Sequence, residues 1–196
     1  DKEIVIWPYN SEKLTPLGYN LSFTRFIFSL KSNLFYDVSI DENTKEIYCV
    51  IQPHDTILVL TQEAVWISNK YAGTFHSKVG IVSKGFGHIS TTLDPNWEGP
   101  LLFSLNNPTD KKIKLVIAKR GENGCDEFKT FVTLIFYKMI SQAKVKQDNL
   151  PSRIEILEQL RGTLKDESIK QAIHTICDFS SFQKNIGEAE NDERDI

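Results

Sequence analysis

The sequence predicts a mainly β protein, a barrel or sandwich of short strands, followed by a C-terminal α-helical extension. Two observations in residues 1–140 indicate the β fold: short runs of β-branched and aromatic residues, and clusters of Gly, Pro, Asn and Asp between them. The third observation is that the spacing of apolar residues changes to a helical period after Tyr137. We therefore divide the chain into a β domain over 1–140, two helices within 141–182 and an acidic tail over 183–196.

The expected strands are short and separated by turn residues. In chain order they are Phe23–Leu30, Glu46–Gln52, Thr56–Leu60, Val65–Ile67, Leu101–Leu105, Ile113–Ala118 and Phe131–Tyr137. The expected turns are Asn33–Asp37, Asp41–Lys45, Asn106–Lys112 and Arg120–Asp126. Because strands and helices do not alternate in this part of the chain, nothing in it indicates a parallel sheet.

Two amphipathic helices are expected after the strands. Ser152 and Glu155 have the spacing of a capping box, which starts a helix over 151–165. Its apolar positions are Ile154, Leu157, Leu160 and Leu164. Asp166 can cap a second helix, whose apolar positions are Ile169, Ala172, Ile173, Ile176 and Cys177. Such a stripe must be covered, and the sequence leaves open whether the barrel or another chain covers it.

The composition excludes several function classes. The chain has 196 residues, 40% of them hydrophobic, which is enough apolar material for a sizeable core. Residues 1–140 carry 15 basic and 15 acidic side chains, so the net charge of −3 comes from the rest of the chain. This balance argues against duplex nucleic acid as the main partner. No apolar run approaches the roughly 20 residues that a membrane-spanning helix needs.

The cysteines and histidines are scattered along the chain. Cys49, Cys125 and Cys177 are odd in number and far apart, and the four histidines are equally dispersed. None of them shows the close spacing of metal ligands, so we predict no metal site. We expect reduced thiols and a cytoplasmic protein.

The segment Thr91–Asn107 carries the most informative motif, TTLDPNWEGPLLFSLNN. Its Leu-Asp-Pro-x-Trp-x-Gly core, followed by an alternating strand, resembles the Ile-Asp-Pro-Gly-Trp-x-Gly signature of the dCTP deaminase and trimeric dUTPase superfamily. Further stretches follow in the order found in that superfamily: Ile6–Pro8, Leu14–Leu21, Pro53–Leu58, Thr61–Glu63, Ala72–Gly73 and Leu134–Phe136. The resemblance extends over about residues 4–140 and leaves the C-terminal part outside.

This resemblance implies a distorted β-barrel or jelly roll that assembles as a homotrimer. It also implies a deoxynucleotide related to dCTP or dUTP, bound between subunits, with Mg²⁺ on the triphosphate. The β-rich prediction above agrees with this fold, whereas the trimer, the nucleotide and the magnesium ion come from the family alone.

Asp94 is the best candidate for a catalytic or binding residue. In the superfamily the matching Asp contacts the 3′-hydroxyl of deoxyribose, and in dUTPases it orients the attacking water. A carboxylate suits both roles because it only accepts hydrogen bonds, and Pro95 would hold it in a fixed turn. The alternative is a turn Asp that binds nearby backbone N–H groups. Trp97 either packs beside the sugar or fills the core.

Position 104 bears on the reaction. In the deaminases, a Glu seven residues after the motif's Trp carries protons during attack on cytosine C4, and here that position is Ser104. A serine hydroxyl cannot replace a carboxyl group as a general acid or base near neutral pH. Ordinary deamination is therefore not expected, although Ser104 remains a candidate nucleotide contact.

The expected phosphate contacts also depart from the family pattern. The Arg/Lys-Ser-Ser-Leu-x-Arg segment of the family corresponds here to His76–Ile81. Ser77 and Lys78 can meet a phosphate with a hydroxyl and an ammonium group, or can form an exposed turn. No glycine-rich lid follows Lys138, so a bound triphosphate would be less well closed off from water.

Three functions are compatible with these observations. The first is a nucleotide-binding protein of this superfamily without standard deaminase activity. The second is an active enzyme, either a dCTP deaminase or a dUTP diphosphatase that uses Asp94. The third is a trimeric scaffold that binds no nucleotide.

Overall fold

The computed structural model describes residues 3–88 and 91–141. In this part of the chain the elements are β1 (Ile4–Trp7), η1 (Ser11–Lys13), β2 (Tyr19–Ser22), β3 (Ile27–Ser29), β4 (Ser39–Ile40), β5 (Glu46–Ile51), β6 (Thr56–Ile67), β7 (Tyr71–Ser77), α1 (Val79–Val82), β8 (Gly87–His88), β9 (Thr92–Leu93), β10 (Glu98–Asn106), β11 (Ile113–Arg120), β12 (Asp126–Phe128) and β13 (Thr130–Lys138). The mainly β fold is therefore confirmed. The predicted helices within 141–182 and the acidic tail lie outside the described residues.

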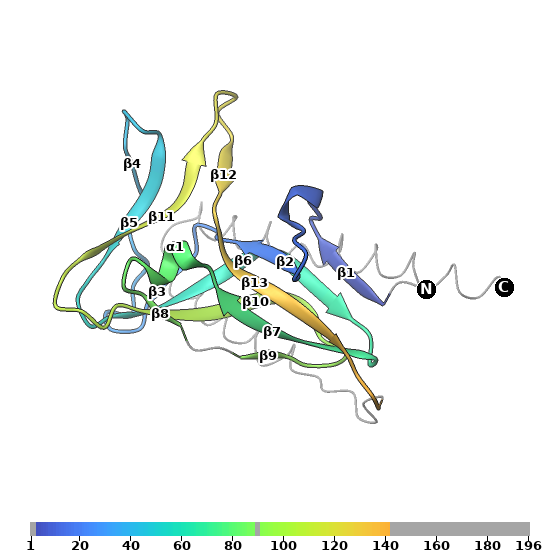
Figure 1. The fold of residues 1–196 in the computed structure, drawn as a ribbon. Coiled ribbons are helices and arrows are strands. Elements are labelled where there is room, and N and C mark those ends of the chain that lie inside the picture. Colours follow the sequence, from blue (N-terminus) through green and yellow to red (C-terminus); the bar gives the residue numbers. More distant parts are fainter. Residues whose placement is uncertain (1–2, 89–90, 142–196) are drawn as a thin grey trace.

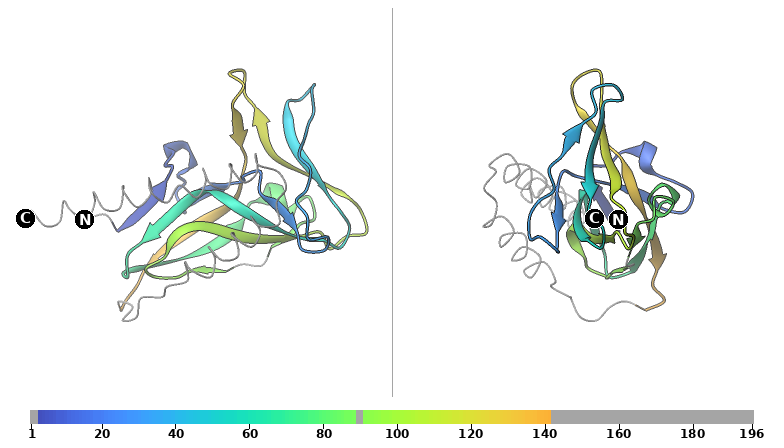
Figure 2. Two further views of the ribbon diagram at one scale, coloured as in Figure 1. Left: turned by 180° about the vertical axis from the view of Figure 1, so that it is seen from behind. Right: turned by 90° about the vertical axis from the view of Figure 1, so that its left-hand side faces the viewer.

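The strands form three antiparallel sheets. Sheet A has the order β1-β6-β10-β8, with β3 also paired to β6. Sheet B has the order β2-β13-β7-β9, and sheet C has the order β12-β11-β5-β4. Sheets A and B make up the body of the molecule, and sheet C projects from one end of it as an arm (Figures 1 and 2). The described residues hold no helix with the length and apolar character needed to cross a membrane.

The core lies on the inner faces of these sheets. Along β6 the odd-numbered residues from Ile57 to Ile67 are all buried, and most even-numbered ones are half-buried, as the two-residue period of a strand requires. Aromatic rings fill the centre: Phe23 stacks on Phe131 with centroids 4.3 Å apart, and Phe103 meets Phe131 edge to face at 5.4 Å. The half of β10 that carries Phe103 is thereby fixed against sheet B.

Two strand predictions differ from the structure. Thr56–Leu60 and Val65–Ile67 belong to one continuous strand, because the intervening Thr61 and Glu63 are buried and hydrogen-bonded within the sheet layer. Phe23–Leu30 was expected as one strand but is interrupted, since Thr24 Oγ1 accepts a bond from the Phe26 N–H and donates to the Leu60 carbonyl. The chain therefore leaves sheet B after β2 and enters sheet A at β3.

Gly18 and Asn20, in the segment Leu14–Leu21, both lie against β13. A Cβ on Gly18 would lie 2.0 Å from the backbone oxygen of Leu134, so only glycine fits where β13 passes. Asn20 accepts a hydrogen bond of 2.8 Å from Thr133 Oγ1, which ties β2 to the same strand. Both residues thus serve the pairing of β2 with β13.

A Gly18→Ser substitution should therefore destabilise the fold. The added atoms meet backbone rather than a movable side chain, so we expect a loss of about 3 kcal/mol in the free energy of unfolding. Urea denaturation of the full chain measures this loss. Gly80→Ser is the matched control, because a Cβ at Gly80 meets nothing within 4 Å. An unchanged midpoint for Gly18→Ser would contradict the close approach of β13.

Candidate functional site

Asp94 lies in the turn that leads from β9 into β10. The backbone N–H of Trp97 donates to the Asp94 carbonyl at 3.2 Å, and Asn96 takes a positive φ of 61° to close the turn. The Asp94 carboxylate accepts a bond of 3.1 Å from Thr92 Oγ1. The Asp94 residue is half-buried, and among the described residues only Thr92 donates to its carboxylate.

The space beside this turn is small within one chain. Phe75, Leu93, Trp97 and Phe103 are among the residues that enclose it with Asp94, and its volume is about 10 Å³. That is room for about one water molecule, whereas pockets for small organic ligands measure roughly 300–1,000 Å³. The Asp94 turn of one chain is therefore not a closed nucleotide pocket by itself.

Trp97 occupies the core side of the turn. The indole is 5% exposed, and its Nε1 donates to the Gly99 carbonyl at 3.1 Å. The indole therefore packs in the core and fixes the start of β10.

A polar surface adjoins Asp94 on the outer side of sheet B. It consists of Asp94 and of residues that share one face of β2, β7, β9 and β13: Asn20, Thr74, His76, Thr92, Thr133 and Tyr137, with the apolar Ile135 opposite Thr74. Thr74 pairs with Thr92, and its Oγ1 lies 3.3 Å from His76 Nε2 and 3.2 Å from the Tyr137 hydroxyl. We call this surface the polar face of sheet B. It offers hydroxyl, imidazole, amide and carboxylate groups to a ligand.

Sequence reasoning missed Thr74, His76 and Tyr137 as members of this surface. The detectable signal was the alternation of polar Thr74 and His76 with Gly73 and Phe75 in β7. The pairing with β9 and β13, which brings these side chains toward Asp94, has no such signal in the sequence.

Ser77 and Lys78 lie away from the Asp94 turn. Ser77 is four residues beyond Gly73, the partner of Leu93, and thus roughly 13 Å along β7 from the turn. Its hydroxyl is buried, finds no hydrogen-bond partner within residues 3–88 and 91–141, and faces the same side as Val132. Lys78 Nζ donates to Thr130 Oγ1 at 2.9 Å. Within one chain these two residues do not share a site with Asp94.

Ser104 is also separate from the turn. It is six residues after Glu98, so it lies roughly 20 Å along β10 from the start of that strand. Ser104 is half-buried, pairs with Leu58, and faces the opposite side of sheet A from Phe103. Asp55 precedes Leu58 by three residues, but its carboxylate is buried and bonded to Ser29 and Tyr36.

The described residues include no group of three or more His, Cys, Asp and Glu side chains able to hold a metal ion. Asp94 is the one carboxylate of the polar face of sheet B.

The described residues thus form an antiparallel β protein with a carboxylate turn beside one polar sheet face. No model of a known protein family matches the chain. A dCTP deaminase of Pyrococcus horikoshii is 30% identical over 138 residues, which cover 70% of this chain and 78% of the relative. A dCTP deaminase of Pyrococcus furiosus is 31% identical over 119 residues, covering 61% of this chain and 72% of the relative. The chain belongs to the dCTP deaminase family.

Solved structures include weaker matches. A dUTPase from phage phi11 of S. aureus has a TM-score of 0.45 and 17% identity, covering 76% of this chain and 97% of that one. A deaminase of 2′-deoxycytidine 5′-triphosphate from Agrobacterium tumefaciens has a TM-score of 0.38 and 12% identity, covering 50% of this chain and 27% of that one.

Proposed function

We propose that this protein binds a deoxynucleoside triphosphate between the chains of a homotrimer and does not deaminate it in the ordinary way. The observation that carries the proposal is the incomplete site of one chain. Asp94 and the polar face of sheet B are ready to contact a ligand, yet the enclosed volume beside them is about 10 Å³. A second chain would supply the missing wall.

The separation of the candidate residues supports a shared site. Ser77 and Lys78 lie roughly 13 Å along β7 from the Asp94 turn, and Ser104 lies farther along β10. In a trimer, the Asp94 turn of one chain can face the end of β7 of its neighbour. The free Asp94 oxygen would then accept the sugar hydroxyl, while Lys78 of the neighbouring chain provides an ammonium group near the phosphates.

The expected loss of deamination depends on Ser104. Attack of water on cytosine C4 needs a group that takes a proton from the water and gives one to the leaving amine. The face of sheet A around Ser104 offers the leucine side chain of Leu58, and the carboxylate of Asp55 lies on the other face. Binding without standard turnover is the function these observations favour.

Isothermal titration calorimetry with dCTP, dUTP and dTTP in the presence of Mg²⁺ tests the binding. We expect saturable binding of at least one of the three, and a tenfold to hundredfold weaker affinity, as estimated for a lost charged hydrogen bond, in Asp94→Asn. Asp110→Asn is the control, because the Asp110 carboxylate is 96% exposed and distant in sequence from the turn. Sedimentation equilibrium of the same samples tests the trimer.

Two results would overturn the proposal. One is the absence of heat and of thermal stabilisation with all three nucleotides, which would favour a scaffold without a ligand. The other is a monomer that binds nucleotide with full affinity. Pyrophosphate release from dUTP that disappears in Asp94→Asn would instead identify a dUTP diphosphatase.

A further inference from the structure

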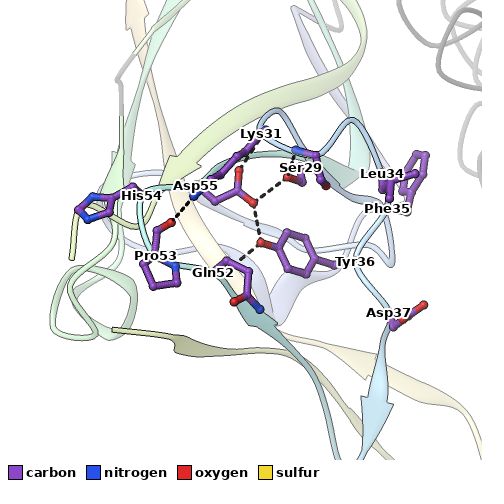
Figure 3. Close-up of a pocket in the computed structure, with 11 residues that line it drawn as sticks. Ser29, Lys31, Leu34, Phe35, Tyr36, Asp37, Gln52, Pro53, His54 and Asp55 are labelled. Carbon is purple, nitrogen blue, oxygen red and sulfur yellow. Dashed lines mark hydrogen bonds between the residues drawn. The ribbon is translucent and has the colours of Figure 1, made fainter. Parts of the chain in front are cut away.

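A second pocket lies at the other end of β6, away from the Asp94 turn. It opens between the segment that connects β3 to β4 and the turn that connects β5 to β6, and its volume is about 530 Å³. This is within the usual range for sites that bind small organic molecules. Figure 3 shows Asp55 and Tyr36 at its centre, with Lys31, Gln52 and Pro53 around them.

The floor of this pocket is a buried carboxylate. Asp55 is 2% exposed, and its Oδ2 accepts bonds from Ser29 Oγ at 2.7 Å and from the Tyr36 hydroxyl at 2.5 Å. Its Oδ1 accepts one longer bond of 3.3 Å, from the backbone N–H of Lys31. Burial and the bond to Asp55 raise the pKa of Tyr36 to about 12, so this hydroxyl stays a donor at neutral pH.

No positive charge compensates this carboxylate within the described part of the chain. None of the ion pairs formed there includes Asp55. Lys31 lines the same pocket, but its ammonium donates to the Pro53 carbonyl at 3.1 Å instead. His54 also lines the pocket, but its Nε2 is paired with Asp110 at 2.8 Å instead. A buried carboxylate bonded only to neutral groups is a favourable partner for a cation that enters from solvent.

The walls are suited to the body of such a cation. Phe35 is held edge to face against Phe26 and Phe28, with centroids 5.0 and 5.1 Å apart, so its ring position is fixed. The Tyr36 ring also lines the pocket and points toward Asp55 (Figure 3), and Leu34 is 66% exposed at the edge. Aromatic faces attract ammonium and guanidinium groups through their quadrupole.

The charge of the lining also favours a cation. The acidic and lysine residues of the lining are Asp37, Asp55 and Lys31, so formal negative charges outnumber the one ammonium group. A phosphate or carboxylate ligand would have to approach two carboxylates against a single ammonium that already has a partner. We propose that this pocket binds a small organic cation, a primary ammonium or guanidinium group on a short apolar or aromatic body.

Titration of the full chain with phenethylammonium chloride, followed by calorimetry and ligand-detected NMR, tests this proposal. 2-Phenylethanol is the matched neutral probe, because it has the same body with a hydroxyl in place of the ammonium. We expect saturable binding of the cation, at least tenfold stronger than that of the alcohol, from an order-of-magnitude estimate for a desolvated charged contact. Asp55→Asn and Phe35→Leu should each weaken it by about tenfold. Glu122→Gln should leave it unchanged, because Glu122 is exposed in the turn between β11 and β12 and does not line the pocket.

The variants separate a binding role from a structural one. If Asp55→Asn does not fold, Phe35→Leu still removes the aromatic face while it keeps an apolar side chain. Equal affinity for the alcohol, absence of saturation, or unchanged affinity in a folded Phe35→Leu protein would overturn the proposal. Inorganic phosphate that competes with the cation for this pocket would overturn it as well. None of these results depends on nucleotide binding at Asp94.

Discussion

This protein should convert dCTP to dUTP about 10²–10⁴-fold more slowly than a family member that has a carboxylate at the position of Ser104. This is the range of rate loss that is typical when a general acid or base is removed. The physical reason is that a serine hydroxyl neither accepts the proton of the attacking water nor returns one to the leaving ammonia. Chromatographic quantification of dUTP, with the dCTP deaminase of Pyrococcus horikoshii as the reference enzyme, measures the difference.

Ser104→Ala is the control for this experiment. Because the hydroxyl has no part in proton transfer, the residual rate should be the same in this variant as in the unmodified chain. A rate close to that of the reference enzyme would show that another group carries the protons. A residual rate that falls further in Ser104→Ala would show that the hydroxyl itself takes part.

Much of the fold could be predicted because the spacing of apolar residues in the sequence matches the pattern of buried residues in each strand. Runs such as Ile113–Ala118 and Phe131–Tyr137 are close to the observed β11 and β13, since their apolar residues alternate or continue as buried strands do. The turn over Arg120–Asp126 is the hairpin between β11 and β12, closed by a bond from the Gly121 N–H to the Cys125 carbonyl. These are short-range features, which a linear sequence contains in full.

The site was harder to predict because it depends on which strands become neighbours. Ser77 has the expected residue type for a phosphate contact, yet its pairing with Val132 turns the hydroxyl toward the core side. His76, one residue earlier, faces solvent beside Thr74. A single step along a strand reverses the face, so only the register decides which side chain reaches a ligand.

The pocket around Asp55 had no signal in the sequence for a related reason. The segment Pro53–Leu58 resembles a family motif and was expected to form a turn and the start of a strand. Ser29 and Tyr36 lie outside that motif. These residues reach Asp55 only because β3 pairs with β6, which places Ser29 directly opposite Ile57. The burial of such a carboxylate can be predicted only when the distant segments that pack against it are known.

The Thr61–Glu63 motif also has a structural role that its sequence does not reveal. Glu63 is fully buried, and its carboxylate accepts two hydrogen bonds, one of 2.7 Å from Lys13 Nζ and one of 2.8 Å from the Ser22 N–H. Thr61 Oγ1 donates to the Glu63 carbonyl and accepts from the Leu101 N–H. One ion pair thereby joins the opening segment of the chain to β2 and to the centre of sheet A.

Lys13→Met should destabilise the protein by about 3–5 kcal/mol, because it leaves the Glu63 carboxylate buried without its cation. The double variant Lys13→Met, Glu63→Gln should recover most of that loss, since a neutral amide still accepts the Ser22 N–H and carries no charge to compensate. Urea unfolding of the full chain, compared by midpoint and slope, measures both changes. Lys45→Met is the control, because its pair with Glu42 is exposed to solvent and its loss should leave the midpoint in place. If Lys13→Met unfolds at the same urea concentration as the unmodified chain, the ion pair does not anchor the opening segment on β6.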